Sequence, residues 1–208
     1  MNQETPIFPL VTTYLPGDKV QLHIFEDRYV HMCSDIEKSN GQFVSVLIER
    51  GHEVGGSDTR SSYGVSITTD DMFRADGRIL LSGHATHVEE ISQWLPDDPY
   101  PRAICRSLLF QIPAEVSPES VAGELTALLW RLDTPEAIAL RDAITHVQVD
   151  RAGSDEALGS FFWTVAGLIP SGPQDRYRLL EIQDVNSRLS LLSEMITHFT
   201  EISEFQGR

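Results

Sequence analysis

Basic residues and cysteines are scarce in this sequence of 208 residues. Lys and Arg number 16 against 31 Asp and Glu, so the formal net charge is −15. Binding along a phosphate backbone requires clustered Lys and Arg, and no basic cluster is visible. We therefore expect neither nucleic acid nor an anionic membrane as a partner. The two cysteines, Cys33 and Cys105, form no CxxC motif, which excludes a disulfide framework or a zinc knuckle and fits a reducing cytoplasm.

Long apolar runs and the common catalytic motifs are also lacking. No run approaches the roughly 20 apolar residues that span a bilayer. The opening "MNQETPIFPL" has no basic region followed by an apolar core, so it does not resemble a signal peptide. The motifs GxxxxGK(S/T), GxGxxG and GxSxG do not occur. We expect no catalytic residues and no cofactor.

The pair His84-x-x-His87 is the one candidate for a metal site. Residues three apart on a strand point to opposite faces, so the two rings would diverge unless a bulge intervenes. A metal-dependent enzyme built on this pair stays as an alternative, although we expect no metal. Cys33 and Cys105 both fall on apolar patterns, where a buried thiol is inert.

Residues 1–112 have the pattern of strands with one helix. The runs that predict strands are VQLHIF (20–25), FVSVLIE (43–49), YGVSITT (63–69), GRILLSGHATHVEEI (77–91) and RAICRSLLFQI (102–112). Turn signals separate these runs, and Asp76-Gly77 indicates a tight hairpin. The helix is predicted by apolar residues at the spacing i, i+3, i+4, i+7: Tyr29, Met32, Cys33 and Ile36.

Residues 113–208 change to a helical period. Ser117 with Pro118, Thr134 with Pro135, Pro173 and Asp184 mark helix starts. The first of these helices has an apolar face made of Val121, Leu125, Leu128, Leu129 and Leu132. The chain is therefore expected to be an α+β protein with a β-rich part, 1–112, followed by a helical part, 113–208.

Large apolar residues in the expected loops are the candidates for partner binding. Met72 and Phe73 precede the predicted hairpin turn, and Trp94 and Tyr100 flank the polar loop LPDDP. Aromatic side chains in loops act as anchors at interfaces. The alternative is that these four side chains close the ends of a small barrel.

The stretch PGDKVQLHIFEDRY (16–29) has a structural interpretation. Pro16 and Gly17 fit a type II turn, and Phe25 precedes the helix, where it can be buried. Glu26 falls in the first helical turn, where negative charge is favourable. Arg28 can reach a carboxylate such as Glu26, and Tyr29 begins the apolar stripe.

Several blocks in register resemble the N-terminal substrate-binding domain of the Lon protease family. They are PIFPL (6–10), LPGDKVQLHIFEDRY (15–29), VLIERGHEVGG (46–56), DGRILLSGHA (76–85) and PYPRA (99–103), with LIPSGPQDRYRLLEIQDVNSRLSLLSEMI (168–196) resembling the family's helical end. The shared motif residues include Gly55 and Gly56, for which we expect a turn with positive φ. This chain departs from the family at YGVSI (63–67) and at Ser57.

The resemblance implies a PUA-like β pseudo-barrel with one inserted helix, followed by a helical bundle. It also implies a stand-alone protein that lacks the ATPase and protease domains of Lon and binds unfolded or extended polypeptide without cleaving it. Such a protein would serve substrate recognition, or act as an adaptor, in proteolysis or quality control. The rival interpretation is a nucleic-acid-binding protein, because PUA-like folds bind RNA elsewhere, but this rests on fold analogy. The sequence predicts no oligomeric state.

Overall fold

A computed structural model of the chain describes residues 3–51, 59–135, 137–139 and 155–206. These residues form two compact units, Met1–Leu108 and Leu109–Arg208. The division lies four residues earlier than the expected boundary, because the last strand ends at Leu108 rather than at residue 112. Phe110 belongs to the second unit, where its ring packs 5.6 Å from that of Phe162.

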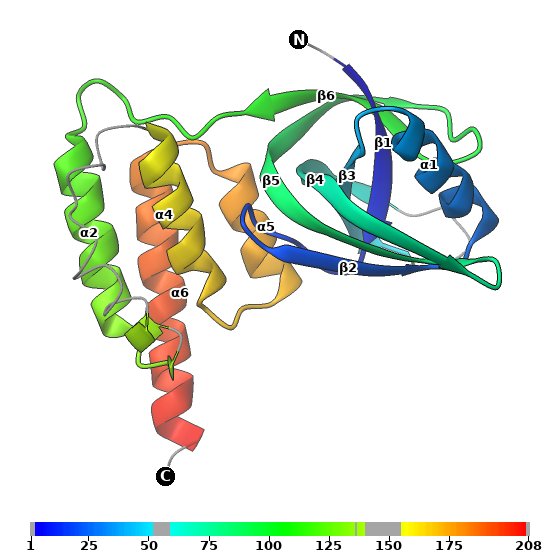
Figure 1. The fold of residues 1–208 in the computed structure, drawn as a ribbon. Coiled ribbons are helices and arrows are strands. Elements are labelled where there is room, and N and C mark those ends of the chain that lie inside the picture. The colour runs from blue at the N-terminus through cyan, green and yellow to red at the C-terminus, as the bar shows by residue number, and fades with distance from the viewer. Residues whose placement is uncertain (1–2, 52–58, 136, 140–154, 207–208) are drawn as a thin grey trace. The chain divides into compact units, whose positions relative to one another are not determined.

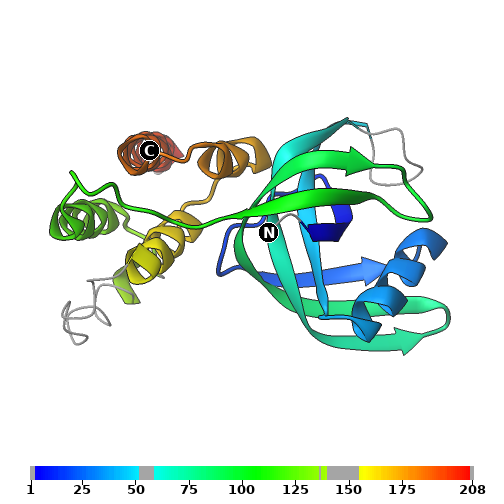
Figure 2. The same ribbon diagram turned by 90° about the horizontal axis from the view of Figure 1, so that it is seen from above.

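The first unit is a curled six-stranded sheet with the order β2-β5-β4-β3-β1-β6 (Figures 1 and 2). A further pairing of β5 with β6 closes five of the strands into a barrel and leaves β2 outside the ring. Only the β1–β3 pair among the described strands is parallel. The strands are β1 (Gln3–Leu10), β2 (Lys19–Ile24), β3 (Gln42–Arg50), β4 (Thr59–Ala75), β5 (Arg78–Leu95) and β6 (Arg102–Leu108).

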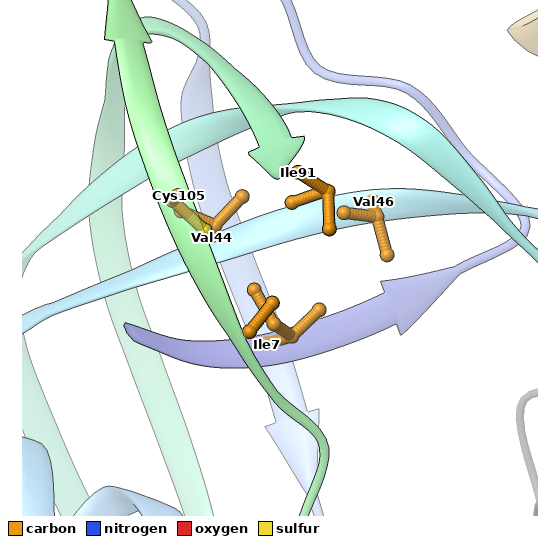
Figure 3. Packing of buried hydrophobic residues seen from close by; sticks show 6 residues of the cluster. Ile7, Val44, Val46, Ile91 and Cys105 are labelled. Carbon is orange, nitrogen blue, oxygen red and sulfur yellow. The ribbon is translucent and has the colours of Figure 1, made fainter. Parts of the chain in front are cut away.

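Apolar side chains from β1, β3, β5 and β6 meet inside the barrel (Figure 3). Alternation along each strand sends every second side chain to this interior. The cluster consists of Ile7, Val44, Val46, Ile91, Ala103 and Cys105. The thiol of Cys105 is therefore a packing group, as the sequence indicated.

Helix α1 (Asp27–Lys38) is the predicted helix within the β-rich part, and it joins β2 to β3 (Figure 1). Its buried residues are the four that the spacing predicted: Tyr29, Met32, Cys33 and Ile36. The Tyr29 ring stacks on Phe8 of β1 with centroids 4.2 Å apart. This contact fixes the helix against the barrel.

Two predicted turns are present where the sequence placed them. Gly17 has φ +95°, and the backbone N–H of Asp18 donates to the Leu15 carbonyl over 3.0 Å, as a type II turn requires. Between β4 and β5, Asp76 and Gly77 both have positive φ, 50° and 73°. That is the geometry of the two-residue hairpin that favours Asp-Gly.

The second unit consists of helices, with α2 (Pro118–Arg131), α4 (Asp155–Gly167), α5 (Pro173–Glu181) and α6 (Val185–Gln206) described. Ser117 caps α2 by accepting from the Ser120 N–H, and Asp184 accepts from the Ser187 N–H at the start of α6. The predicted apolar face of α2 is buried throughout. The helix expected from Thr134 lies mostly outside the described residues, but the Thr134 hydroxyl does accept from the Ala137 N–H over 3.1 Å.

None of the helices within the described ranges combines the length and apolarity needed to cross a bilayer. The predicted α+β class, with a β pseudo-barrel, one inserted helix and C-terminal helices, is confirmed.

Candidate functional site

The charged residues Glu26, Asp27 and Arg28 lie at the start of α1, where Glu26 and Arg28 form a structural contact. The Arg28 guanidinium contacts the Glu26 carboxylate at 3.0 Å, and it lies 4.5 Å above the Tyr29 ring. Glu26 occupies the N-cap position, and its side chain accepts no hydrogen bond from a backbone N–H of the helix. The pairing expected for Arg28 is thus present, and negative charge lies at the helix start as expected.

Phe25 departs from the expectation that it is buried. Its side chain is 55% exposed, because the inward positions of β2 are taken by the buried residues Val20, Leu22 and Ile24. Residue 25 therefore falls on the outward parity of the strand. The predicted turn residues Gly55 and Gly56 lie outside the described residues.

The four residues that the sequence placed in loops do not form one exposed surface, and three of them lie in strands: Met72 and Phe73 in β4 and Trp94 in β5. Tyr100 is buried, and its hydroxyl donates to Asp35 over 3.1 Å; burial raises the pKa of Tyr100 to about 12. Trp94 packs against the barrel core, with the Arg60 guanidinium 5.3 Å above its ring. Met72 is half-buried, whereas Phe73 is 63% exposed. Phe73 is the most exposed of the four.

Phe73 is part of an apolar row on the outer face of β2, β5 and β4. It lies directly opposite Leu80 on β5, and Leu80 lies opposite His23 on β2. Leu80 is 56% exposed. The Phe25 ring continues the row, 6.3 Å from that of His23. We call His23, Phe25, Phe73 and Leu80 the outer-face cluster.

The sequence analysis missed Leu80 and Phe25, although the signal was available. The Asp76-Gly77 turn sets the register of the hairpin, with Ala75 opposite Arg78. Counting back by two residues on each strand places Phe73 opposite Leu80. Because Ile79 and Leu81 face inward, Leu80 must face outward.

The two histidines of the candidate metal pair contact different carboxylates. His84 Nδ1 lies 2.9 Å from Asp70 Oδ1, and His87 Nε2 lies 2.9 Å from Glu89 Oε1. The pairing of β5 with β4 shifts register between Ala85 and Val88, so a strand irregularity does lie between the two histidines. Within the described ranges, no group of three or more His, Cys, Asp or Glu side chains could hold a metal ion.

The two cysteines are free and buried. Burial raises the pKa of Cys33 to about 11 and that of Cys105 to about 12. Both are therefore thiols at neutral pH, and a thiol is a poor nucleophile and metal ligand.

Comparisons with known proteins agree with the fold. The chain is similar to the "Lon N-terminal domain protein from Xanthomonas campestris", with 24% identity, a TM-score of 0.65, and coverage of 91% of this chain and 96% of that one. It is also similar to the "N terminal domain of Mycobacterium avium complex Lon protease", with 18% identity, a TM-score of 0.60, and coverage of 94% and 98%. The two TM-scores show that the fold is shared. A comparison with curated proteins finds no match.

The sequence profile of one family covers nearly the whole chain. Residues 4–198 match the profile described as the ATP-dependent protease La (LON) substrate-binding domain. The match includes the barrel, the inserted helix α1 and most of the helical unit. The chain belongs to the family of Lon substrate-binding domains.

Proposed function

We propose that this protein is a non-catalytic polypeptide-binding module that recognises unfolded or extended chains through the outer-face cluster. The observation that carries the proposal is the row of Phe25, Leu80 and Phe73, each more than half exposed: Leu80 and Phe73 lie on adjacent strands, and Phe25 directly follows β2. Contiguous exposed apolar side chains mark interaction sites on soluble domains. The family's description as a substrate-binding domain favours a polypeptide as the ligand.

The non-catalytic part of the proposal is supported by the state of the candidate nucleophiles and bases. Both thiols are buried and have raised pKa values. His87 contacts Thr86 through Nδ1 and Glu89 through Nε2, and the Ser107 hydroxyl donates to the same carboxylate. Side chains satisfied in this way stabilise the barrel rather than activate a substrate. We propose that the module delivers or recognises clients in proteolysis or quality control, as an adaptor in the cytoplasm.

Site-specific crosslinking tests this proposal. A photoreactive phenylalanine analogue at position 73 should crosslink to a reduced, carboxymethylated protein that cannot fold, and the crosslinks should decrease when unlabelled unfolded protein is added. The same analogue at Leu109, which is 71% exposed in the second unit, is the matched control and should give few crosslinks. Equal yields at the two positions would refute the assignment of the surface.

A further inference from the structure

One edge of β2 is open beside the outer-face cluster. β2 pairs with β5 along Lys19–Ile24, while β6 pairs with β5 farther along, from Val88. Within the described part of the chain, the backbone of β2 forms no backbone hydrogen bond beyond β5. An edge strand of this kind presents unpaired N–H and C=O groups to which an extended segment can add.

An added strand would extend the apolar row. Directly opposed residues in a sheet face the same side. A residue opposite His23 would therefore continue the row of Phe73, Leu80 and His23. Because side chains alternate along a strand, the residues opposite Lys19, Gln21, His23 and Phe25 would all face outward.

The charged side chains on the strands nearest the open edge are cations. β2 and the part of β5 that pairs with it, Arg78–His84, contain Lys19 and Arg78 but no carboxylate, whereas Asp70 and Asp71 lie farther from the edge, on β4. Arg78 and Lys19 are both exposed on the outer face, at opposite ends of β2, and neither forms an ion pair with a described residue. Six other cations of the same unit are matched by carboxylates of the chain: Arg28, Lys38, Arg60, Arg74, Arg102 and Arg106. In a chain with a net charge of −15, two unmatched cations on one face favour carboxylates supplied by the ligand.

We infer that β2 accepts an extended acidic-apolar segment as an added strand, an inference that rests on the proposed polypeptide-binding function. The segment has apolar side chains opposite Gln21 and His23, which lie against the outer-face cluster. Its carboxylates lie opposite Lys19 and Phe25. A Glu opposite Phe25 can reach Arg78. Arg78 lies on β5, two strand spacings or about 10 Å from the backbone of the added strand.

A second copy of this chain fits the edge less well. The sequence of β2, KVQLHI, contains no carboxylate, so a second β2 strand would bring another Lys19 to the edge and no carboxylate to pair with Lys19 or Arg78. Two copies would also bring together net charges of −15 each. An acidic-apolar segment from another protein brings carboxylates to Lys19 and Arg78, and it carries far less negative charge than a second copy of this chain.

Peptide binding followed by amide hydrogen exchange tests this inference. The probe is Glu-Thr-Phe-Thr-Val-Thr-Glu flanked by Gly-Ser linkers, and the control peptide has Lys in place of both Glu residues. We expect the acidic probe to bind about three- to tenfold more tightly than the Lys peptide, in line with one or two exposed ion pairs. Saturation with the probe should slow exchange at alternate amides of Lys19–Ile24.

Two charge variants separate a local effect from net charge. Arg78→Glu should abolish the preference for the acidic probe, because it replaces one of the two cations with a carboxylate that offsets the remaining Lys19. Arg178→Glu changes the net charge equally on α5 of the second unit, where Arg178 is half exposed, and should leave the preference unchanged.

The outcomes distinguish this inference from the proposed function. Binding of both peptides with equal affinity, or binding without protection of β2 amides, would overturn strand addition while leaving polypeptide binding intact. If the chain bound neither the peptides nor unfolded protein, the proposed function itself would fail, and this inference would fail with it.

Discussion

The ion pair between Arg28 and Glu26 gives the charged residues at the start of α1 a structural role. Each side chain is 20% exposed, so solvent weakens their attraction only in part. Glu26 provides no side-chain cap, and the contact of Arg28 with the Tyr29 ring is lost equally in the Arg28→Ala single mutant and in the double mutant, so the cycle isolates the ion pair. We expect a coupling of about 0.5–1 kcal/mol in a double-mutant cycle of Glu26→Ala and Arg28→Ala, measured by urea unfolding. Additive effects of the two substitutions would show that the pair contributes nothing.

The buried thiol of Cys105 predicts a loss of stability at alkaline pH. Burial raises its pKa from 9.0 to about 12, so above pH 9 the unfolded chain releases a proton that the folded chain retains. The free energy of unfolding should therefore fall as the pH rises from 9 toward 12. In Cys105→Ala the fall should be shallower over this range. If the free energy of unfolding fell equally with pH in the two proteins, the raised pKa of Cys105 would not be the cause.

At the scale of elements, close backbone packing explains one glycine of β4. A Cβ on Gly64 would lie too close to the backbone carbonyl of Ser45 and 2.8 Å from the Val46 side chain. Gly64→Ala must therefore shift the β3–β4 pair, and we expect a loss of about 2 kcal/mol or more in thermal or urea unfolding.

Gly123 provides the matched control within a helix. It lies inside α2, and a Cβ there meets nothing within 4 Å. Gly123→Ala should stabilise the protein by about 0.5–1 kcal/mol, because Ala is the better helix former. If both glycines responded alike, close packing at Gly64 would not be the explanation.

Most elements could be predicted from the sequence, but β1 could not. Its two prolines, Pro6 and Pro9, argue against a strand between two neighbours. The structure resolves this by dividing β1: residues Gln3 to Pro6 pair with β6, and residues Ile7 to Leu10 pair with β3. Each proline thus faces one paired edge only. Sequence periodicity cannot show this change of partner, because it arises from barrel closure.

The candidate site could be predicted only in part, because strand pairing between distant segments decides which side chains are exposed. Phe73 was identified, but Trp94 and Tyr100 were grouped with it because all three lay near expected turns. β5 is a single strand of 18 residues, and the pairing with β6 turns Trp94 toward the core. The helix caps at Ser117 and Asp184, in contrast, depend on a few adjacent residues, so the sequence was sufficient to predict them.

At the scale of the whole molecule, the central claim is that the outer-face cluster binds unfolded polypeptide. The most direct measurement is the dissociation constant for a fluorescent, reduced and carboxymethylated protein, by anisotropy. Phe73→Ser and Leu80→Ser should each raise this constant about fivefold or more, since anchors at interfaces contribute about 1 kcal/mol or more. Leu109→Ser, at a more exposed apolar position in the helical unit, should leave the dissociation constant within about twofold. Unchanged binding in Phe73→Ser and Leu80→Ser, with the fold intact, would contradict the account.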